Sequence, residues 1–138
     1  MYFALVTDWA DSDVERRDLD DVLLADAQRR IAELNQRHGD RFFLFHRERR
    51  FNPAEGVWMG WERKRGKLEE LNRLLRGARD TSFIVIEGRM PGRFQYVLTL
   101  DSDTKLPREA ARRLVAKISH PLNRPVYDQS VGRVVRGY

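Results

Sequence analysis

The chain predicts an α/β fold in which helices flank a mostly parallel sheet. Short apolar runs of strand length alternate with segments whose apolar residues recur at helical spacing. The order from the N-terminus is strand, helix, strand, helix, strand, which is typical of layered α/β proteins. With 138 residues, the chain has the size of one domain or of part of one.

The first half carries two of these strands with a helix between them. "YFALVTD" predicts a buried strand that ends at Asp8, and an acidic loop follows it. A helix is expected from residue 19 to about residue 37, with Gly39 just past its end. Its apolar residues recur at helical spacing: Leu23, Ala27, Ile31 and Leu34. "RFFLFHRE" then predicts the second strand.

A loop and a basic helix come next. The loop contains Pro53, Gly56 and Gly60 and carries two tryptophans, Trp58 and Trp61. These tryptophans suit either core anchors or a platform that stacks on a sugar or base. The segment "ERKRGKLEELNRLLRG" predicts a helix that is capped by Gly77. Its leucines lie on one stripe: Leu68, Leu71 and Leu75.

The second half begins with two more expected strands, "SFIVIEG" and "FQYVLTLD", joined as a hairpin by "RMPGR". Pro107 fits the first turn of a helix, with Glu109 in that turn, and Pro121 stops it. Its expected core stripe is Ala110, Leu114 and Ile118. Short β-like pieces follow in the tail.

Composition narrows the classes of function. Charged residues make up 34% and aromatic residues 10%, which suits a soluble globular chain, and no apolar stretch approaches the ~18–20 residues that cross a bilayer. The absence of cysteine excludes disulfides and thiolate metal sites. His38, His46 and His120 are scattered, which argues against a histidine metal site. Oxygen ligands remain as the metal chemistry.

The net charge of +5 hides an asymmetry. Residues 1–26 hold eight acidic residues and two arginines, whereas the remainder holds thirteen acidic residues and twenty-four lysines and arginines. Solvated helix faces explain such a split most simply, and a basic nucleic-acid-binding module is an alternative. The basic residues alternate with acids over several elements, so no nucleic-acid partner is expected.

Two expected strands end on aspartates, one at Asp8 and the other at Asp101. Ligands of α/β sheets bind outside the carboxyl ends of strands, so these aspartates are candidate site residues. Asp101 and Asp103 are spaced to bind one hard divalent cation, Mg²⁺ or Mn²⁺, together with substrate phosphates. The alternative is an acidic turn that caps the next helix.

A magnesium-dependent phosphatase of the haloacid-dehalogenase type is a further alternative, because it also ends a strand with D-x-D. That pattern places Thr or Val two positions after the second aspartate, whereas here Thr104 comes one position after Asp103. The phosphatase motif also stands near the start of its domain, whereas this one follows several elements.

Two long blocks carry a more specific resemblance: "FNPAEGVWMGWERKRGKLEELNRLLRG" and "YVLTLDSDTKLPREAARRLVAKISHPLNRP". Together with "YFALVTDWAD", they resemble the glycosyltransferase region of bacterial cyclic β-1,2-glucan synthases. More distantly, the layout is similar to GT-A glycosyltransferases, in which a strand-end Asp precedes a G-K-x-x-x-L-N helix and then D-x-D. The resemblance therefore implies a partial GT-A fold, a mixed, mostly parallel sheet flanked by helices.

The resemblance also implies roles for particular residues. Asp8 would approach the uracil end of UDP-glucose, and the helix with Gly66, Lys67 and Asn72 would lie by the donor pocket. Asp101 and Asp103 would hold Mg²⁺ or Mn²⁺ with the sugar diphosphate, and the acceptor would be a growing β-1,2-glucan. Each residue has a simpler explanation: Lys67 as a solvated charge, Asn72 in capping or packing, and Asp8 at the start of a turn.

Some parts of the family pattern are missing. The strand that precedes the equivalent of Tyr2, the acidic motif with the general base, and the Q-x-x-R-W acceptor motif have no counterpart. Residues 1–138 thus resemble the middle of one glycosyltransferase domain of a larger enzyme, at the cytoplasmic side of the bacterial inner membrane. We expect the chain alone to be inactive, with the rest of that enzyme as its partner. Dimerisation through an exposed sheet edge is the alternative.

Overall fold

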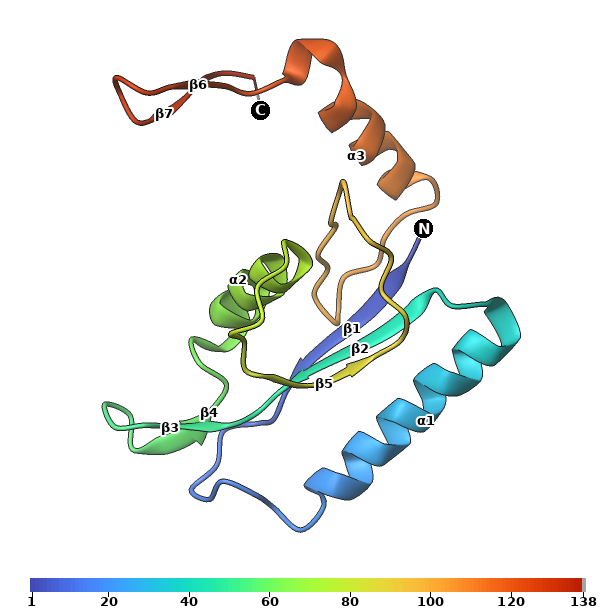
Figure 1. Ribbon diagram of the computed structural model, residues 1–138, viewed down its shortest axis with the longest axis vertical. Helices are drawn as coiled ribbons and strands as arrows, with labels where there is room; N and C mark the ends of the chain where they lie inside the picture. The colour runs from blue at the N-terminus through green and yellow to red at the C-terminus, as the bar shows by residue number, and fades with distance from the viewer. Residues whose placement is uncertain (138) are drawn as a thin grey trace. The chain divides into compact units, whose positions relative to one another are not determined.

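A computed structural model describes residues 1–137 and divides the chain into two compact units, residues 1–93 and residues 94–138 (Figure 1). The predicted mixture of helices and strands is confirmed. None of the helices within residues 1–137 is long and apolar enough to cross a membrane.

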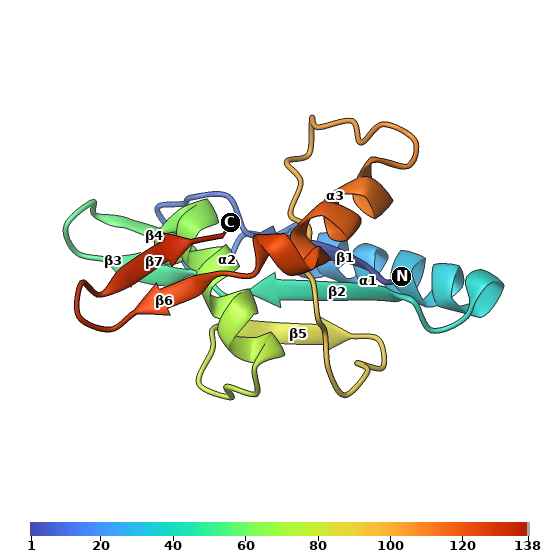
Figure 2. The ribbon, with the colours of Figure 1, turned by 90° about the horizontal axis from the view of Figure 1, so that it is seen from above.

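The first unit is built on a sheet of three strands in the order β1-β2-β5. Strand β1 (Phe3–Asp8) runs parallel to β2 (Phe42–Arg47), and β5 (Phe83–Glu87) runs antiparallel to β2, as Figure 2 shows. The prediction of a mostly parallel sheet is therefore wrong. After α2 the chain returns to the same end of β2 at which it left this strand. There Glu48 N–H, just after β2, donates to Ser82 O, just before β5, at 3.0 Å. Strand β5 therefore runs back along β2.

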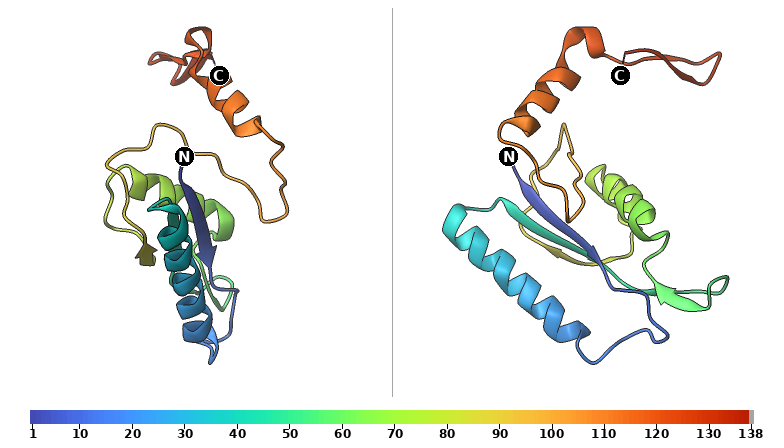
Figure 3. Two further views of the ribbon diagram at one scale, coloured as in Figure 1. Left: turned by 90° about the vertical axis from the view of Figure 1, so that its right-hand side faces the viewer. Right: turned by 180° about the vertical axis from the view of Figure 1, so that it is seen from behind.

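Two helices cover opposite faces of this sheet (Figures 1 and 3). Helix α1 (Asp20–His38) packs on β2 and β5, and helix α2 (Arg63–Leu75) packs on the other face. The apolar core lies under α2, where Phe43, Phe45 and Leu71 are buried together. Successive residues of β2 point to opposite faces of the sheet, and residues 43–47 are all buried. Both faces of this strand are therefore covered.

Both helices end at the predicted glycines. Gly39 follows α1 with a φ of 78°, and Gly77 follows α2 with a φ of 99°. At the end of α2, Gly77 N–H donates to Leu74 O and Ala78 N–H donates to Arg73 O, the paired bonds of a Schellman motif. The expected stripe of α1 needs one correction, because Leu23 is exposed and Leu24 is half-buried in its place.

The loop with the two tryptophans contains a hairpin that the sequence did not predict. Strands β3 (Arg50–Asn52) and β4 (Val57–Met59) pair antiparallel. Trp58 packs against Phe51 with ring centroids 5.7 Å apart and forms a bridge with Ser12, so this tryptophan is a packing residue. Trp61 is exposed.

Strand β1, expected to be buried, is only half covered. Phe3 and Leu5 are each about half exposed, because β1 is an edge strand and α1 packs on β2 and β5. Its last residues, from Val6 to Asp8, are the more buried part of the strand.

The second unit contains helix α3 (Ala110–Ser119), the short 3₁₀ helix η1 (Pro121–Asn123) and a hairpin of β6 (Val126–Asp128) and β7 (Arg133–Arg136). The hairpin confirms the expected β pieces of the tail, and α3 ends before Pro121 as predicted. None of residues 94–137 is buried.

Four predictions for this unit are wrong. Residues 94–101 form no strand, so the hairpin through "RMPGR" is also absent. A strand is stable only when neighbours satisfy its backbone hydrogen bonds, and this segment pairs with none of the described strands. Helix α3 begins at Ala110, because Glu109 has a φ of 64°, which lies outside helical geometry. The expected core residues Leu114 and Ile118 are each about half exposed.

Candidate functional site

Asp8 stands at the carboxyl end of β1, as predicted, and contacts two cations. Its register partner at the end of β2 is Arg47, whose Nε donates to Asp8 Oδ1 at 2.6 Å. The other oxygen, Oδ2, lies 3.2 Å from Lys67 Nζ on α2. The structure thus brings together two residues that the sequence predicted for one site.

Arg47 is the centre of a buried network. Its Nη1 donates to Glu70 Oε2 at 3.1 Å, and its Nη2 donates to the backbone oxygen of Arg63 at 2.9 Å. The hydroxyl of Ser82 also donates to Glu70 Oε2. Asp8, Arg47, Lys67 and Glu70 carry two negative and two positive charges, so the network is electrically balanced. Charge-assisted hydrogen bonds of this kind compensate for the cost of burying ions.

Two glycines near this network stand where a side chain would clash with its surroundings. A Cβ atom on Gly60 would lie 2.9 Å from both Arg47 Nη2 and Asp8 Cγ. Gly66, a predicted site residue, is buried in the first turn of α2, and a Cβ atom there would lie 2.1 Å from the Trp61 carbonyl oxygen. The glycine before Lys67 therefore has a steric role, since it allows α2 to start close to the preceding loop.

Asn72, the remaining predicted residue of α2, is exposed on that helix. Its backbone oxygen accepts a hydrogen bond from Arg76 N–H at the helix end. Within the described contacts it takes no part in the network of Asp8 and Arg47, and its role in donor binding stays a prediction.

A second buried ion pair lies on the α1 side. Arg49 pairs with Asp20 at the start of α1, donates to Ala10 O at 2.8 Å, and stacks over the ring of Trp9. Burial acts to raise the pKa of Asp20, but hydrogen bonds from Arg49 and from Arg17 N–H outweigh it, so this pKa is below its usual value. The pair fixes the loop that follows Asp8.

His46 is buried between these two ion pairs. Its Nδ1 lies 2.8 Å from Thr7 Oγ1, and its ring meets Trp9 edge-on at a centroid distance of 4.2 Å. In the described part of the chain, Nε2 has no hydrogen-bond partner. Burial lowers the pKa of His46 below its usual value, although Asp8 and Asp20 oppose this shift. Burial therefore favours the neutral form of the ring.

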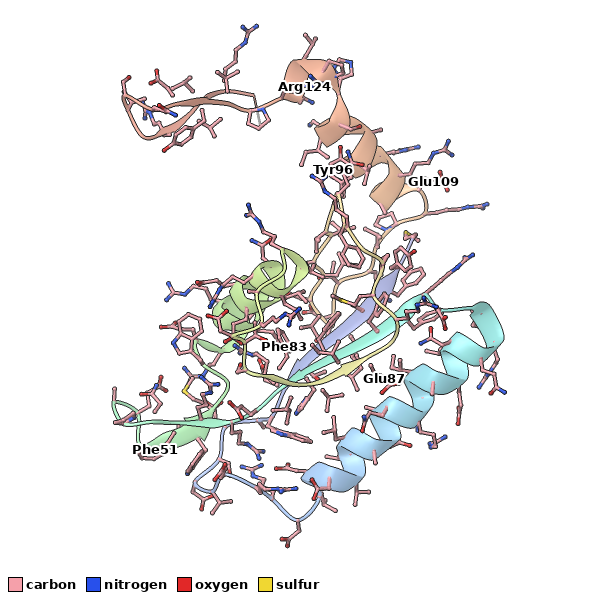
Figure 4. All side chains as sticks on the ribbon, viewed as in Figure 1. Phe51, Phe83, Glu87, Tyr96, Glu109 and Arg124 are labelled. Atoms are coloured by element: carbon pink, nitrogen blue, oxygen red, sulfur yellow. The ribbon has the colours of Figure 1, made fainter. Side chains whose placement is uncertain are left out.

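Asp101 and Asp103 belong to the second unit. They lie in a tight turn, closed by a hydrogen bond of 3.0 Å from Thr104 N–H to Asp101 O, and both residues are exposed. Figure 4 labels Glu109 at the start of α3, and this N-cap residue makes no side-chain capping bond. Since α3 begins only at Ala110, the two aspartates do not stand at its N-cap.

The donor set at this turn limits the kind of cation site. Within residues 1–137, no three His, Cys, Asp or Glu side chains gather around one point. Two carboxylates fit a Mg²⁺ or Mn²⁺ ion that takes its other ligands from water and substrate phosphates, which is how Mg²⁺ usually binds. These two carboxylates do not match a metal site in which the protein supplies all of the ligands.

A surface groove lies elsewhere in the first unit, between the second half of α1 and the end of β5. Figure 4 shows Phe83 and Glu87 on opposite sides of β5, toward α2 and α1 respectively, and Glu87 lines the groove. None of the predicted site residues lines it.

The sequence interpretation missed Arg47 and Glu70. One signal was available for each: Arg47 directly continues the apolar run "FFLFH", where a charged residue is unusual. Glu70 stands four residues after Gly66 and next to Leu71, so it falls on the inward side of α2. Buried charges at such positions are expected to be paired.

No protein-family model matches the chain. Over its whole length it is 56% identical to the cyclic β-(1,2)-glucan synthase NdvB of Rhizobium meliloti (strain 1021), in an alignment of 142 residues. The chain spans 5% of the length of that relative. This similarity confirms the resemblance to cyclic β-1,2-glucan synthases that was drawn from the sequence.

Proposed function

We propose that the chain is part of the glucosyltransferase domain of a cyclic β-1,2-glucan synthase and contributes to binding of the nucleotide sugar. The observation that carries the proposal is the 56% identity to NdvB over the whole chain. The enzyme would transfer glucose from UDP-glucose to a growing β-1,2-glucan, at the cytoplasmic side of the inner membrane. The chain alone would be inactive, since it spans 5% of that relative.

Asp8 and Lys67 would contact the nucleotide. Support comes from the position of Asp8 at the carboxyl end of β1, where ligands of α/β sheets bind, and from its contact with Lys67 of α2 at 3.2 Å. A carboxylate accepts hydrogen bonds from N–H and O–H groups of a base or ribose, and an ammonium group attracts phosphate. Gly66 would keep Lys67 in place through the close start of α2.

Asp101 and Asp103 would bind the Mg²⁺ or Mn²⁺ that accompanies the diphosphate. Two exposed carboxylates in one turn suit a cation that arrives together with its phosphate ligands. When bound, the cation would neutralise charge on the departing diphosphate. The part of this chain's own residues at the cation is to supply these two carboxylates.

Calorimetric titration of the 138-residue chain with UDP, with and without Mn²⁺, tests this proposal. We expect weak binding that Mn²⁺ strengthens, and we expect the Mn²⁺ effect to vanish in the double variant Asp101→Asn/Asp103→Asn. Asp128→Asn serves as the matched control, since it removes another carboxylate of the same unit. An Mn²⁺ effect that survives in the double variant would contradict the metal assignment.

A further inference from the structure

Solvent reaches the network around Arg47 from one side. The side-chain exposure is 0% for Arg47 and 8% for Glu70, but it rises to 13% for Asp8 and 21% for Lys67. A ligand that arrives from solvent therefore meets Asp8 and Lys67, and it does not meet Arg47. Any effect of Arg47 on that ligand has to pass through another residue.

The contacts of Arg47 leave it little freedom. Its three nitrogens donate separately to Asp8 Oδ1, to Glu70 Oε2 and to the backbone oxygen of Arg63. The planar guanidinium holds these donors in one rigid fork, so the orientation of one contact fixes the others. Gly60 lies against the same group, at a distance that leaves no space for a side chain.

The orientation of Asp8 follows from this arrangement. Because Oδ1 is held by the buried Arg47, Oδ2 is the oxygen on the more exposed side, where Lys67 Nζ lies. Lys67 has a flexible stem and a partly exposed ammonium group, so it is the partner that a ligand can displace. Arg47 would keep the Asp8 carboxylate in place during that exchange.

We infer that Arg47, held by Glu70, is a positioning residue that orients the Asp8 carboxylate toward the ligand. This inference rests on the proposed nucleotide-binding role of Asp8. It assigns two separate roles to the cations beside Asp8: Arg47 fixes the carboxylate, and Lys67 exchanges between the carboxylate and the phosphates of the ligand.

The test removes Arg47 without leaving a buried charge unpaired. Arg47→Met alone would leave Glu70 buried without a cation, whereas Arg47→Met/Glu70→Leu replaces the pair by apolar side chains, a change that proteins often tolerate. The matched control is Arg49→Met/Asp20→Leu, which removes the other buried pair, on the α1 side. Both double variants are compared with the unchanged chain for UDP affinity and thermal unfolding.

We expect Arg47→Met/Glu70→Leu to stay folded. It should bind UDP about tenfold or more weakly, because Asp8 and Arg47 are coupled and the Asp8 carboxylate would no longer be held in its orientation. Adding Asp8→Asn to this variant should weaken binding no further, since Asp8 has already lost its orientation. The control keeps the contacts of Asp8 with Arg47 and Lys67, so it should weaken UDP binding much less than Arg47→Met/Glu70→Leu does. Equal UDP affinity in Arg47→Met/Glu70→Leu and in the unchanged chain would overturn the inference.

A ligand-free measurement separates this inference from the proposed function. Carbon relaxation gives the order parameter of the Asp8 side chain, which should fall below about 0.6 in Arg47→Met/Glu70→Leu and stay high in the control. If the unchanged chain does not bind UDP, the proposed function fails and the order parameter still decides the role of Arg47. An unchanged order parameter would overturn that role.

If the double variant Arg47→Met/Glu70→Leu does not fold, Arg47→Lys tests the same role of Arg47. It keeps one positive charge but cannot span three acceptors, so we expect a higher mobility of Asp8 and a weaker affinity for UDP. Wild-type values of both quantities in Arg47→Lys would contradict the inference.

Discussion

The two units of the chain hold their predicted site residues in opposite ways. In residues 1–93, Asp8 and Lys67 are fixed by the sheet, by α2 and by the buried Arg47. In residues 94–137, Asp101 and Asp103 lie in an exposed turn, in a segment without a single buried residue. The first unit thus holds its candidate residues by its own packing, whereas the second unit presents its two candidate carboxylates on an exposed turn.

This difference has a physical basis in what covers each apolar surface. Phe43 and Phe45 of β2 are buried under α2, and burial of such side chains contributes about 1.5–3 kcal/mol each. The apolar residues of α3 receive no such cover, as Leu114 and Ile118 show. An amphipathic sequence therefore produces a helix in both units but a packed core only in the first.

Amide hydrogen exchange should show the largest contrast between the units. The amides of β2 should exchange only through global unfolding, and those of residues 94–109 should exchange through local opening that costs almost no free energy. For a stability of about 5 kcal/mol, this predicts protection factors that differ by about five-thousandfold. Similar protection of both segments would contradict this difference between the two units.

The substitution Gly66→Ala should have the next largest effect. Alanine normally favours a helix by about 1 kcal/mol over glycine. Here its Cβ would lie 2.1 Å from a backbone oxygen, so overpacking should outweigh this gain and destabilise the first unit by about 1–3 kcal/mol. Urea unfolding measures the change.

Gly92→Ala is the control for this substitution, because a Cβ atom there meets nothing within 4 Å. Its effect should stay within about 0.5 kcal/mol. If Gly66→Ala were as mild as Gly92→Ala, the close start of α2 would not restrict Lys67.

The pH dependence of stability should show a smaller effect, through His46. Burial lowers its pKa in the folded chain, so the unfolded chain binds a proton first as the pH falls through about 6.5. The free energy of unfolding should therefore decrease between pH 7 and pH 5.5, by at most about 1.4 kcal/mol per pH unit. Urea unfolding at several pH values measures this slope.

His46→Phe should reduce that slope, because the buried titrating group is gone. His38→Gln is the matched control, since His38 is exposed at the end of α1. Equal slopes in the unchanged chain and in His46→Phe would show that another group dominates the pH dependence.

The sequence located the two helices and the three sheet strands of the first unit, but it missed the β3–β4 hairpin and the direction of β5. Hydrophobic periodicity and the glycines after each helix located α1 and α2, because these signals are local. The direction of β5 depends instead on which end of β2 the chain returns to, and residue spacing does not encode this. The run "YVLTL" has the apolar character of a strand, yet strand formation also needs a hydrogen-bonding neighbour.

The site was predictable to the extent that its residues resemble a known pattern. The ends of the expected strands indicated Asp8, Asp101 and Asp103, and the resemblance added Gly66, Lys67 and Asn72. Arg47 belongs to no such motif. Its importance follows only from burial and from contacts between residues distant in the sequence, which the structure supplies.

Nitrogen-15 NMR of the chain, titrated with UDP in the absence of metal, tests the central claim that the Asp8 and Lys67 edge of the first unit binds the nucleotide. We expect shift changes at Asp8, Trp9, Gly66 and Lys67, and we expect Asp8→Asn to abolish them. Shift changes that instead centre on the groove between α1 and β5, or that persist unaltered in Asp8→Asn, would contradict it.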